Sequence, residues 1–364
     1  VKKYSPETEC KKVPRQLCGP SGCQQTAGPE ECFDRNLIKS SLYLFVSLAM
    51  TIGSGVLAYL FIPLTWSWLP AWIGYAIVAG TAGTGCWVVA HECGHRAFTK
   101  HNWLQDMIGY CLHSILLVPY FSWQRSHSVH HARTNHLDSG ETHVPHRDTT
   151  PSGAARLWWH ETIGDEAFAI ILILINTVAG WPLYLLTGAS GGPARGTTNH
   201  FWPAWPFSAA LFPGGWSRKV WLSDIGVLVA IGLLGWWTYS SGFLPVLALY
   251  LGPYLVVNFW LVLYTWLQHT DVDIPHFDNE EWTWVKGAFM TVDRPYGFIL
   301  DFLHHRIGST HVAHHPIPAH PAGALGCARQ TREGETAPPS FVLRWFPFAP
   351  NTKGSAATSA PNRL

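Results

Sequence analysis

Residues 69–95 read LPAWIGYAIVAGTAGTGCWVVAHECGH, an apolar run that ends in two histidines. Residues 69–90 contain no charged side chain, and a helix needs about 20 such residues to cross the hydrocarbon core of a bilayer. His91 follows directly, so we expect it at the membrane surface. Residues four apart project from the same side of a helix, so His91 and His95 can point at one metal ion. This stretch therefore predicts a membrane helix with imidazole ligands at its end.

The composition also favours a membrane protein. Of the 364 residues, 48% are hydrophobic and only 13% are charged, and 20 are tryptophan. The formal charge of +1 gives no indication of a nucleic-acid partner. Twenty histidines are far more than a chain of this length ordinarily carries, which indicates metal ligation. The eight cysteines lack the paired spacing of a zinc knuckle, and we interpret them as reduced thiols.

Three other runs have the length and composition of membrane helices, at residues 41–63, 220–237 and 243–266. Uncharged turns at residues 64–68 and 238–242 join the four runs into two hairpins. Seven Lys and Arg residues precede the first run, whereas both turns have none, so the positive-inside rule predicts a cytosolic N-terminus. The histidines that follow the second and fourth runs are then cytosolic as well.

Two more apolar stretches, residues 104–121 and 168–186, are interpreted as interfacial rather than spanning. All histidine clusters must lie on one side of the membrane to share metal ions. The first stretch lies between two clusters and must return to its own side, and a crossing by the second would bring the last cluster to the wrong side. Residues 190–216, rich in Gly, Pro and Trp, are expected to form a loop. The predicted fold is an all-α integral membrane fold with four transmembrane helices in two hairpins, interfacial helices and a cytosolic histidine-rich cap.

Three histidine clusters have helical spacing: HECGH at 91–95, HSVHH at 127–131 and HVAHH at 311–315. Each can aim two or three ring nitrogens at a common point. His269 occupies the place after the fourth run that His91 occupies after the second. Imidazole suits iron, zinc, copper and nickel, and the ligands are too many for one ion, so we expect two metals. The candidate ligands are His91, His95, His127, His130, His131, His269, His311, His314 and His315.

Other polar residues near the clusters are candidates for supporting roles. The groups that could orient imidazole rings are Asp138, Glu141, Asp271, Asp301 and His305. The remaining histidines in this part of the chain are interpreted as ordinary surface or core residues, among them His101, His113, His143 and His146.

Two other metal chemistries remain open at this point. HECGH matches H-E-x-x-H, in which Glu92 would act as the general base of a membrane zinc metalloprotease, but a single zinc would leave six clustered histidines unexplained. Histidine pairs can also ligate haem inside a helix bundle, whereas these clusters lie at its mouth. A two-metal site at the membrane surface suits oxygen chemistry on a lipid chain, because no side-chain acid or base removes hydrogen from an unactivated methylene.

Around these clusters the sequence resembles the membrane fatty acid desaturases, in particular the microsomal-type delta-12 (omega-6) oleate desaturases. The resemblance covers roughly residues 30–315. Glu92 and THVAHH at 310–315 are similar to delta-12 members, whereas omega-3 relatives usually carry Asp after the first histidine. The other similar segments are CFDRNLIK at 32–39, WVVAHECGH at 87–95, LVPYFSW at 117–123, WTWVKGA at 282–288 and TVDR at 291–294.

This resemblance implies that the eight cluster histidines bind two iron ions, with His269 as an additional ligand. It implies conversion of an oleoyl chain on a membrane phospholipid into a linoleoyl chain, with O₂ and two electrons. A separate cytochrome b5 and its NADH-dependent reductase would supply the electrons in the endoplasmic reticulum membrane. Related hydroxylases, epoxygenases, acetylenases and omega-3 desaturases differ at few positions and remain alternatives.

Three regions are expected: a cytosolic segment at 1–40, a membrane desaturase domain at 41–315 and an atypical, disordered tail at 316–364. After His315 the family usually continues with Leu-Phe and an amphipathic stretch, but this sequence continues PIPAHP and becomes rich in Pro, Ala and Gly. A shifted reading frame or a retained intron is our hypothesis for this departure. An inactive isoform is the functional alternative that follows from it.

Overall fold

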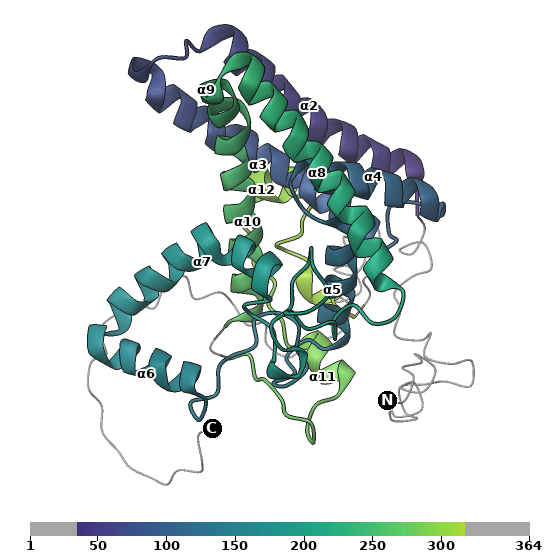
Figure 1. Cartoon of the computed structure of the whole chain (residues 1–364), viewed down its shortest axis with the longest axis vertical. Helices are drawn as coiled ribbons and strands as arrows, with labels where there is room; N and C mark the ends of the chain where they lie inside the picture. The colour runs from purple at the N-terminus through teal and green to yellow at the C-terminus, as the bar shows by residue number, and fades with distance from the viewer. Residues whose placement is uncertain (1–34, 272, 317–364) are drawn as a thin grey trace.

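The computed structural model describes residues 35–271 and 273–316, which form helices joined by turns and loops (Figure 1). Within these two ranges no β-strand occurs, and one isolated β-bridge joins His136 to Phe277. The prediction of an all-helical fold is therefore confirmed for the described residues. Most of the predicted segment 1–40 and nearly all of the predicted tail 316–364 lie outside them.

Long apolar helices form the upper part of Figure 1. They form because each run offers a long series of uncharged residues whose backbone groups can be satisfied within the helix itself. The four runs predicted from the sequence are helical, with ends that differ by a few residues from those predicted. The elements are α2 (Leu37–Phe61), η3 (Trp66–Trp68), α3 (Leu69–Gly94), α8 (Trp216–Ser241), α9 (Phe243–Val246), η5 (Leu247–Leu251) and α10 (Gly252–His269).

These helices are arranged as two hairpins. α2 packs along α3, and α8 turns into α9 and then α10. Both turns lie at the same end of the bundle, at the top of Figure 1, and the histidine-bearing ends of α3 and α10 lie at the other end. α3 and α10 pack against each other along their length, whereas α8 diverges to contact α4 and α5.

The fourth apolar helix is interrupted by the π-helical turn η5. Pro253 has no N–H group, so the carbonyl of Leu249, four residues earlier, has no α-helical donor. The hydroxyl of Tyr75 on α3 donates to this carbonyl at 3.0 Å. Tyr250, in the turn itself, donates to the carbonyl of Ile115 at 2.6 Å. The two tyrosines therefore tie the interrupted helix to its neighbours at a depth where water cannot satisfy the backbone.

Small residues on α3 allow α10 to approach closely. A Cβ atom at Gly80 would lie 2.5 Å from Val256 Cβ and 2.6 Å from the carbonyl oxygen of Pro253. Close backbone approach of this kind is how helices pack in a membrane, where no hydrophobic effect draws them together. Below this contact, Val88 of α3 joins a buried cluster with Val257 and Leu261 of α10.

The remaining helices surround the histidine-bearing end. Residues 104–121, predicted not to span, divide between α4 and the start of α5, and α4 has only 14 residues. Residues 190–216, predicted as a loop, contain one 3₁₀ turn before α8 begins at Trp216. These elements are α4 (Asn102–Ile115), α5 (Tyr120–Ala132), α6 (Pro151–Ile163), α7 (Asp165–Thr187), η4 (Pro193–Arg195), α11 (Trp284–Phe289), α12 (Phe298–Leu303) and α13 (His311–His314).

α7 is a fifth helix that is long and apolar enough to cross a membrane. The sequence prediction placed its residues 168–186 at the interface. Trp181, Tyr184 and Leu185 of α7 pack against Leu261 and Val262 of α10, in the half of α10 that leads to His269. In Figure 1, α7 lies beside this lower half rather than alongside α2 and α8. By length and composition, the described residues therefore offer five candidate crossings, one more than the four predicted.

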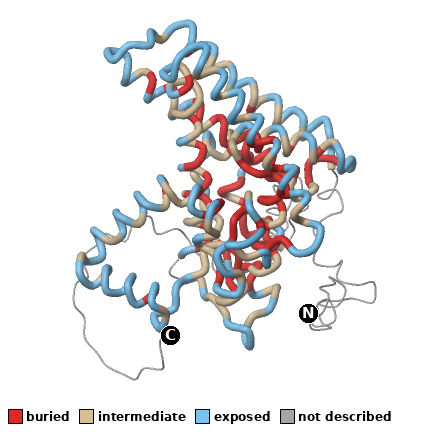
Figure 2. Tube along the Cα trace, viewed as in Figure 1, coloured by how far each residue is buried: buried red, intermediate tan, exposed pale blue. Residues whose placement is uncertain are grey.

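The exposed surface of the helix bundle indicates whether water or lipid surrounds it. Buried residues gather along the centre of the molecule and around its lower part, whereas the outward sides of α2 and α8 are exposed (Figure 2). Those exposed sides carry large apolar residues, for example Phe45 and Leu60 on α2 and Leu228 and Leu233 on α8. A water-soluble monomer rarely exposes continuous apolar surface of this extent. The chain is therefore a membrane protein.

Candidate metal centre

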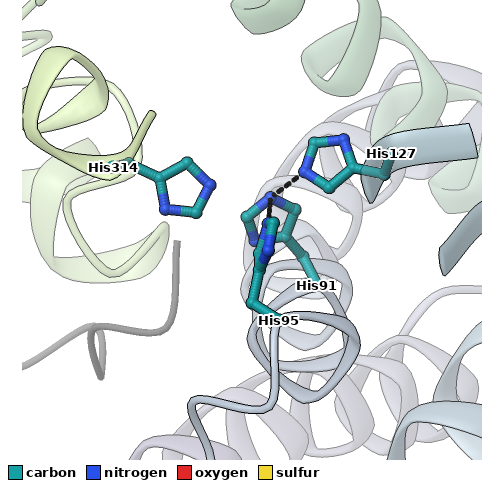
Figure 3. A group of neighbouring side chains, drawn as sticks. All are labelled: His91, His95, His127 and His314. Carbon is teal, nitrogen blue, oxygen red and sulfur yellow. Dashed lines mark hydrogen bonds between the residues drawn. The ribbon is translucent and has the colours of Figure 1, made fainter. Parts of the chain in front are cut away.

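A first group of four imidazoles converges where α3 and α5 end. His91 Nε2 lies 2.8 Å from His127 Nε2 and 3.2 Å from His95 Nε2. His314 approaches from the opposite side, and Figure 3 shows its ring facing the other three. One candidate ligand atom from each of the four rings lies within 4.8 Å of all the others. Such a set of nitrogens can surround a single metal ion.

A second group lies beside the first. His130, His269 and His315 have ligand atoms within 4.8 Å of one another. His311 joins them, because its Nε2 is 3.0 Å from His269 Nε2 and 3.1 Å from His315 Nε2. His131 lies between the groups: its Nε2 is 3.2 Å from His127 Nε2, and its ring stacks on His315 at a centroid distance of 4.3 Å.

Oxygen atoms hold the outer nitrogen of several rings. Glu92 Oε1 lies 3.1 Å from His91 Nδ1, Thr142 Oγ1 lies 2.8 Å from His130 Nδ1, and Thr134 Oγ1 lies 3.1 Å from His315 Nδ1. An acceptor at Nδ1 fixes the ring proton there and leaves the Nε2 lone pair free for a metal. These contacts orient the rings toward the two group centres.

The helix dipoles also contribute to the electrostatic field at the metal site. His91 and His95 lie at the C-terminal end of α3, His130 in the last turn of α5 and His269 at the last position of α10. Helix C-termini carry a partial negative charge, which favours a nearby cation. Three helix ends therefore support positive charge at the point where the imidazoles meet.

The cluster imidazoles outside the membrane helices are neutral at pH 7. Burial, reinforced by repulsion from neighbouring rings, lowers the pKa of His127, His130, His314 and His315 well below its ordinary value. The same causes lower the pKa of His311 to about 3. Metals bind the neutral ring, so no proton has to be displaced before binding.

A metal ion fits the arrangement because some of the buried nitrogens lack other partners. Among residues 35–271 and 273–316, both ring nitrogens of His314 and Nδ1 of His311 are buried without a hydrogen bond. Unpaired buried polar atoms ordinarily cost about 1–3 kcal/mol each. A cation at the first group would satisfy the inward nitrogen of His314. An all-imidazole donor set suits iron, zinc, copper or nickel.

Comparison with known proteins identifies the family. A model of the fatty acid desaturase family matches residues 66–347. The chain belongs to the fatty acid desaturases. Similar relatives include the delta(12) fatty acid desaturase of Calendula officinalis, with 40% identity over 292 residues, 79% of this chain and 73% of the relative. The delta(12)-fatty-acid desaturase of Arabidopsis thaliana is 38% identical over 309 residues, 84% of this chain and 77% of the relative.

A third relative carries a location in its name. The omega-6 fatty acid desaturase, endoplasmic reticulum isozyme 1, of Glycine max is 37% identical over 296 residues, 81% of this chain and 74% of the relative. Membership of the desaturases decides against the zinc protease and haem interpretations of the histidine clusters. The family match also continues past His315 into the segment that we expected to depart from the family.

The structure brings together all nine histidines predicted as ligands, but it places the other predicted groups elsewhere. Asp138 pairs with Arg147 at 2.9 Å on the surface. Glu141 is buried and accepts a hydrogen bond from Tyr184 at 2.9 Å, and burial raises its pKa to about 8. His305 is bonded to Ser47 at 2.9 Å and lies outside both groups.

Among residues 35–271 and 273–316, the two remaining candidates also make no contact with the rings. Asp271 pairs with Arg294 at 2.6 Å. Asp301 lies in the first turn of α12, and none of its contacts within the described ranges reaches an imidazole of either group. The orienting oxygens come instead from Glu92, Thr134 and Thr142, of which only Glu92 is adjacent to a ligand in sequence.

An apolar groove lies among the long apolar helices. It has a volume of about 490 Å³ and is lined by residues of α2, α3, α8, η5 and α10 together with Ile115 and Leu116 at the end of α4. On α3 the lining residues Tyr75, Ala79 and Gly83 are spaced four apart. His91 lies on the same helix, eight residues after Gly83.

Proposed function

We propose that this desaturase is an acyl-lipid delta-12 (omega-6) desaturase, which converts oleoyl to linoleoyl chains on membrane phospholipid with O₂ and two electrons. The observation that carries the proposal is the pair of all-imidazole groups at the ends of α3 and α10, two helices that also line an apolar groove. The names of the similar relatives support the delta-12 position. The two electrons are assigned to a separate cytochrome b5 and its reductase.

The proposed cofactor is a pair of iron ions. We assign one iron to His91, His95, His127 and His314 together with His131, and the other to His130, His269, His311 and His315. When bound, the irons supply the oxidant that an unactivated methylene requires. The chain itself fixes the imidazole rings, excludes water and positions the acyl chain.

The groove explains how the substrate is positioned. Its lining has almost no polar surface, so an acyl chain can enter from the bilayer without desolvating a protein polar group. Gly83 leaves room in the lining, since a Cβ there would meet Val257 only at 3.4 Å. From Gly83 to His91 the rise along α3 is about 12 Å. In this proposal, that distance sets the length of acyl chain between the groove and the iron. This spacing is the basis of the proposed regioselectivity.

The proposed topology has four crossings. His130 precedes α7 and His269 ends α10, yet their Nε2 atoms are 3.2 Å apart. An even number of crossings must therefore separate them. With α8 and the α9–α10 segment as crossings, α7 stays on the histidine side. The Lys- and Arg-rich segment before α2 supports a cytosolic position for that side in the endoplasmic reticulum membrane.

Expression in a host that makes oleate but no linoleate tests the proposal. The expected product is a 9,12-diene, identified by mass spectrometry of derivatives that report double-bond position. A His130→Ala variant should abolish the product, whereas His146→Ala, on an exposed residue of the same region, should retain it. A hydroxylated or epoxidised product would replace the assignment with another reaction of the family.

A second experiment applies if the expressed protein forms no diene. If the chain accumulates in the membrane and makes no diene, residues 316–364 are replaced by the C-terminal sequence of a similar relative. Rescue by that replacement would identify the natural chain as an inactive isoform. Continued silence with an intact relative as positive control would contradict the delta-12 assignment.

A further inference from the structure

The loop after α5 brings one more histidine to the second metal group. The ring of His143 lies parallel to that of His269, with centroids 5.6 Å apart and planes 10° apart. Neighbouring rings within the second group have centroids 4.6 to 5.0 Å apart, so His143 lies just outside the group and faces His269. The sequence pattern gave no sign of this, because His143 belongs to no cluster.

The loop holds His143 in place through its neighbours. Thr142 is bonded to His130 Nδ1 at 2.8 Å, so the preceding residue is fixed to the same group. His143 itself has a φ of +55°, a left-handed conformation that a residue other than glycine rarely adopts without a surrounding reason. Residues held in such conformations concentrate at functional sites.

His143 differs from the other rings of the group in two ways. His130, His269, His311 and His315 are buried, whereas His143 is only partly buried. Within the described part of the chain, its ring nitrogens make no hydrogen bond, so no other partner competes for their lone pair. Burial lowers the pKa of its ring to about 4, which keeps the ring neutral at pH 7.

We propose that His143 is a further imidazole of the second metal group, and that it supplies an exchangeable ligand to the ion held by His130, His269, His311 and His315. The inference rests on the proposed two-iron centre. A ring on a partly exposed loop can leave and rejoin the ion without disturbing the helices that carry the other four ligands. His143 therefore slows the loss of the second ion. Its ring is partly exposed to solvent.

Metal release from the purified full-length chain tests this proposal. The wild-type protein is loaded anaerobically with Fe(II), the iron per chain is measured, and release to a coloured chelator is followed over time. His143→Gly is the main variant, because a φ of +55° suits glycine and the substitution adds no backbone strain. His146→Gly is the matched control, three residues along the same loop and exposed.

The expected result is that one of the two irons leaves His143→Gly at least about tenfold faster, the lower end of what losing a supporting group costs in metal affinity. Added imidazole should restore the slow rate in this variant and leave wild type unchanged. His143→Phe keeps a ring against His269 but offers no nitrogen, so it should release iron as fast as the glycine variant.

Three outcomes would overturn the assignment of His143. The first is that His143→Gly releases iron at the wild-type rate. The second is that His143→Phe releases iron slowly. The third is that His146→Gly releases iron as fast as His143→Gly. A wild-type chain that holds fewer than two irons would instead reject the two-iron centre itself, which separates that failure from a failure of His143.

Discussion

Gly80→Ala tests the contact that holds the two ligand-bearing helices together. The new methyl carbon would lie 2.5 Å from Val256 Cβ, 2.8 Å from Val256 Cγ1 and 2.6 Å from the carbonyl oxygen of Pro253. Neither a β-branched side chain nor a backbone carbonyl can rotate away, so α3 and α10 must separate. Overpacking of this kind lowers the free energy of unfolding by about 1–3 kcal/mol.

The separation should also reach the metal centre. Gly80 lies 11 residues before His91 on α3, a rise of about 17 Å. α3 carries His91 and α10 carries His269, which belong to different groups, so moving the helices apart changes the spacing of the two irons. We expect lower iron content as well as a lower midpoint of thermal unfolding.

Gly74→Ala is the control for this prediction. It lies on the same helix, and a Cβ there meets no atom within 4 Å. Replacing glycine by alanine inside a helix is otherwise favourable by about 0.5–1 kcal/mol, so the control should be as stable as wild type or slightly more so. Thermal unfolding of both purified variants in one detergent measures the difference. Equal midpoints for Gly80→Ala and Gly74→Ala would refute the close-packing argument.

Three further predictions concern individual contacts. Thr142→Val removes the hydrogen bond to His130 and should weaken iron binding by about 10–100-fold, measured by chelator competition; unchanged affinity would contradict its orienting role. Tyr75→Phe removes the hydroxyl that donates to the carbonyl of Leu249 and should cost about 0.5–1.5 kcal/mol of stability, which a denaturation series would detect. Gly83→Leu should fill the groove and reduce conversion of oleoyl chains at least about tenfold at normal iron content; full conversion would exclude this groove as the acyl site.

Much of the architecture could be predicted from the sequence because hydrophobic length and helical spacing are local properties. The four apolar runs are helices, and the helical spacing within each cluster points its histidines to one side, where the structure joins them into two groups. α7 shows where the method stops. Its length and composition are those of a crossing, so the sequence alone could not distinguish it from one, and the proposed interfacial position rests on its packing against the lower half of α10 and on the meeting of His130 with His269.

The groups around the histidines could not be predicted in the same way. Proximity in sequence suggested Asp138, but that carboxylate pairs with Arg147, because an exposed charge is satisfied by the nearest exposed partner. Thr134 and Thr142 reach the rings only because the loop after α5 folds back over them. His143 depends on a left-handed backbone conformation that no hydrophobic or charge pattern reports.

The iron content of the protein tests the central claim most directly. The chain is purified in detergent from cells grown with iron and zinc both present, and the metals are quantified per chain by mass spectrometry. Two irons per chain, falling by at least one in His130→Ala, are expected from the two imidazole groups. A single zinc per chain, unaffected by His130→Ala, would contradict the two-iron account of this desaturase.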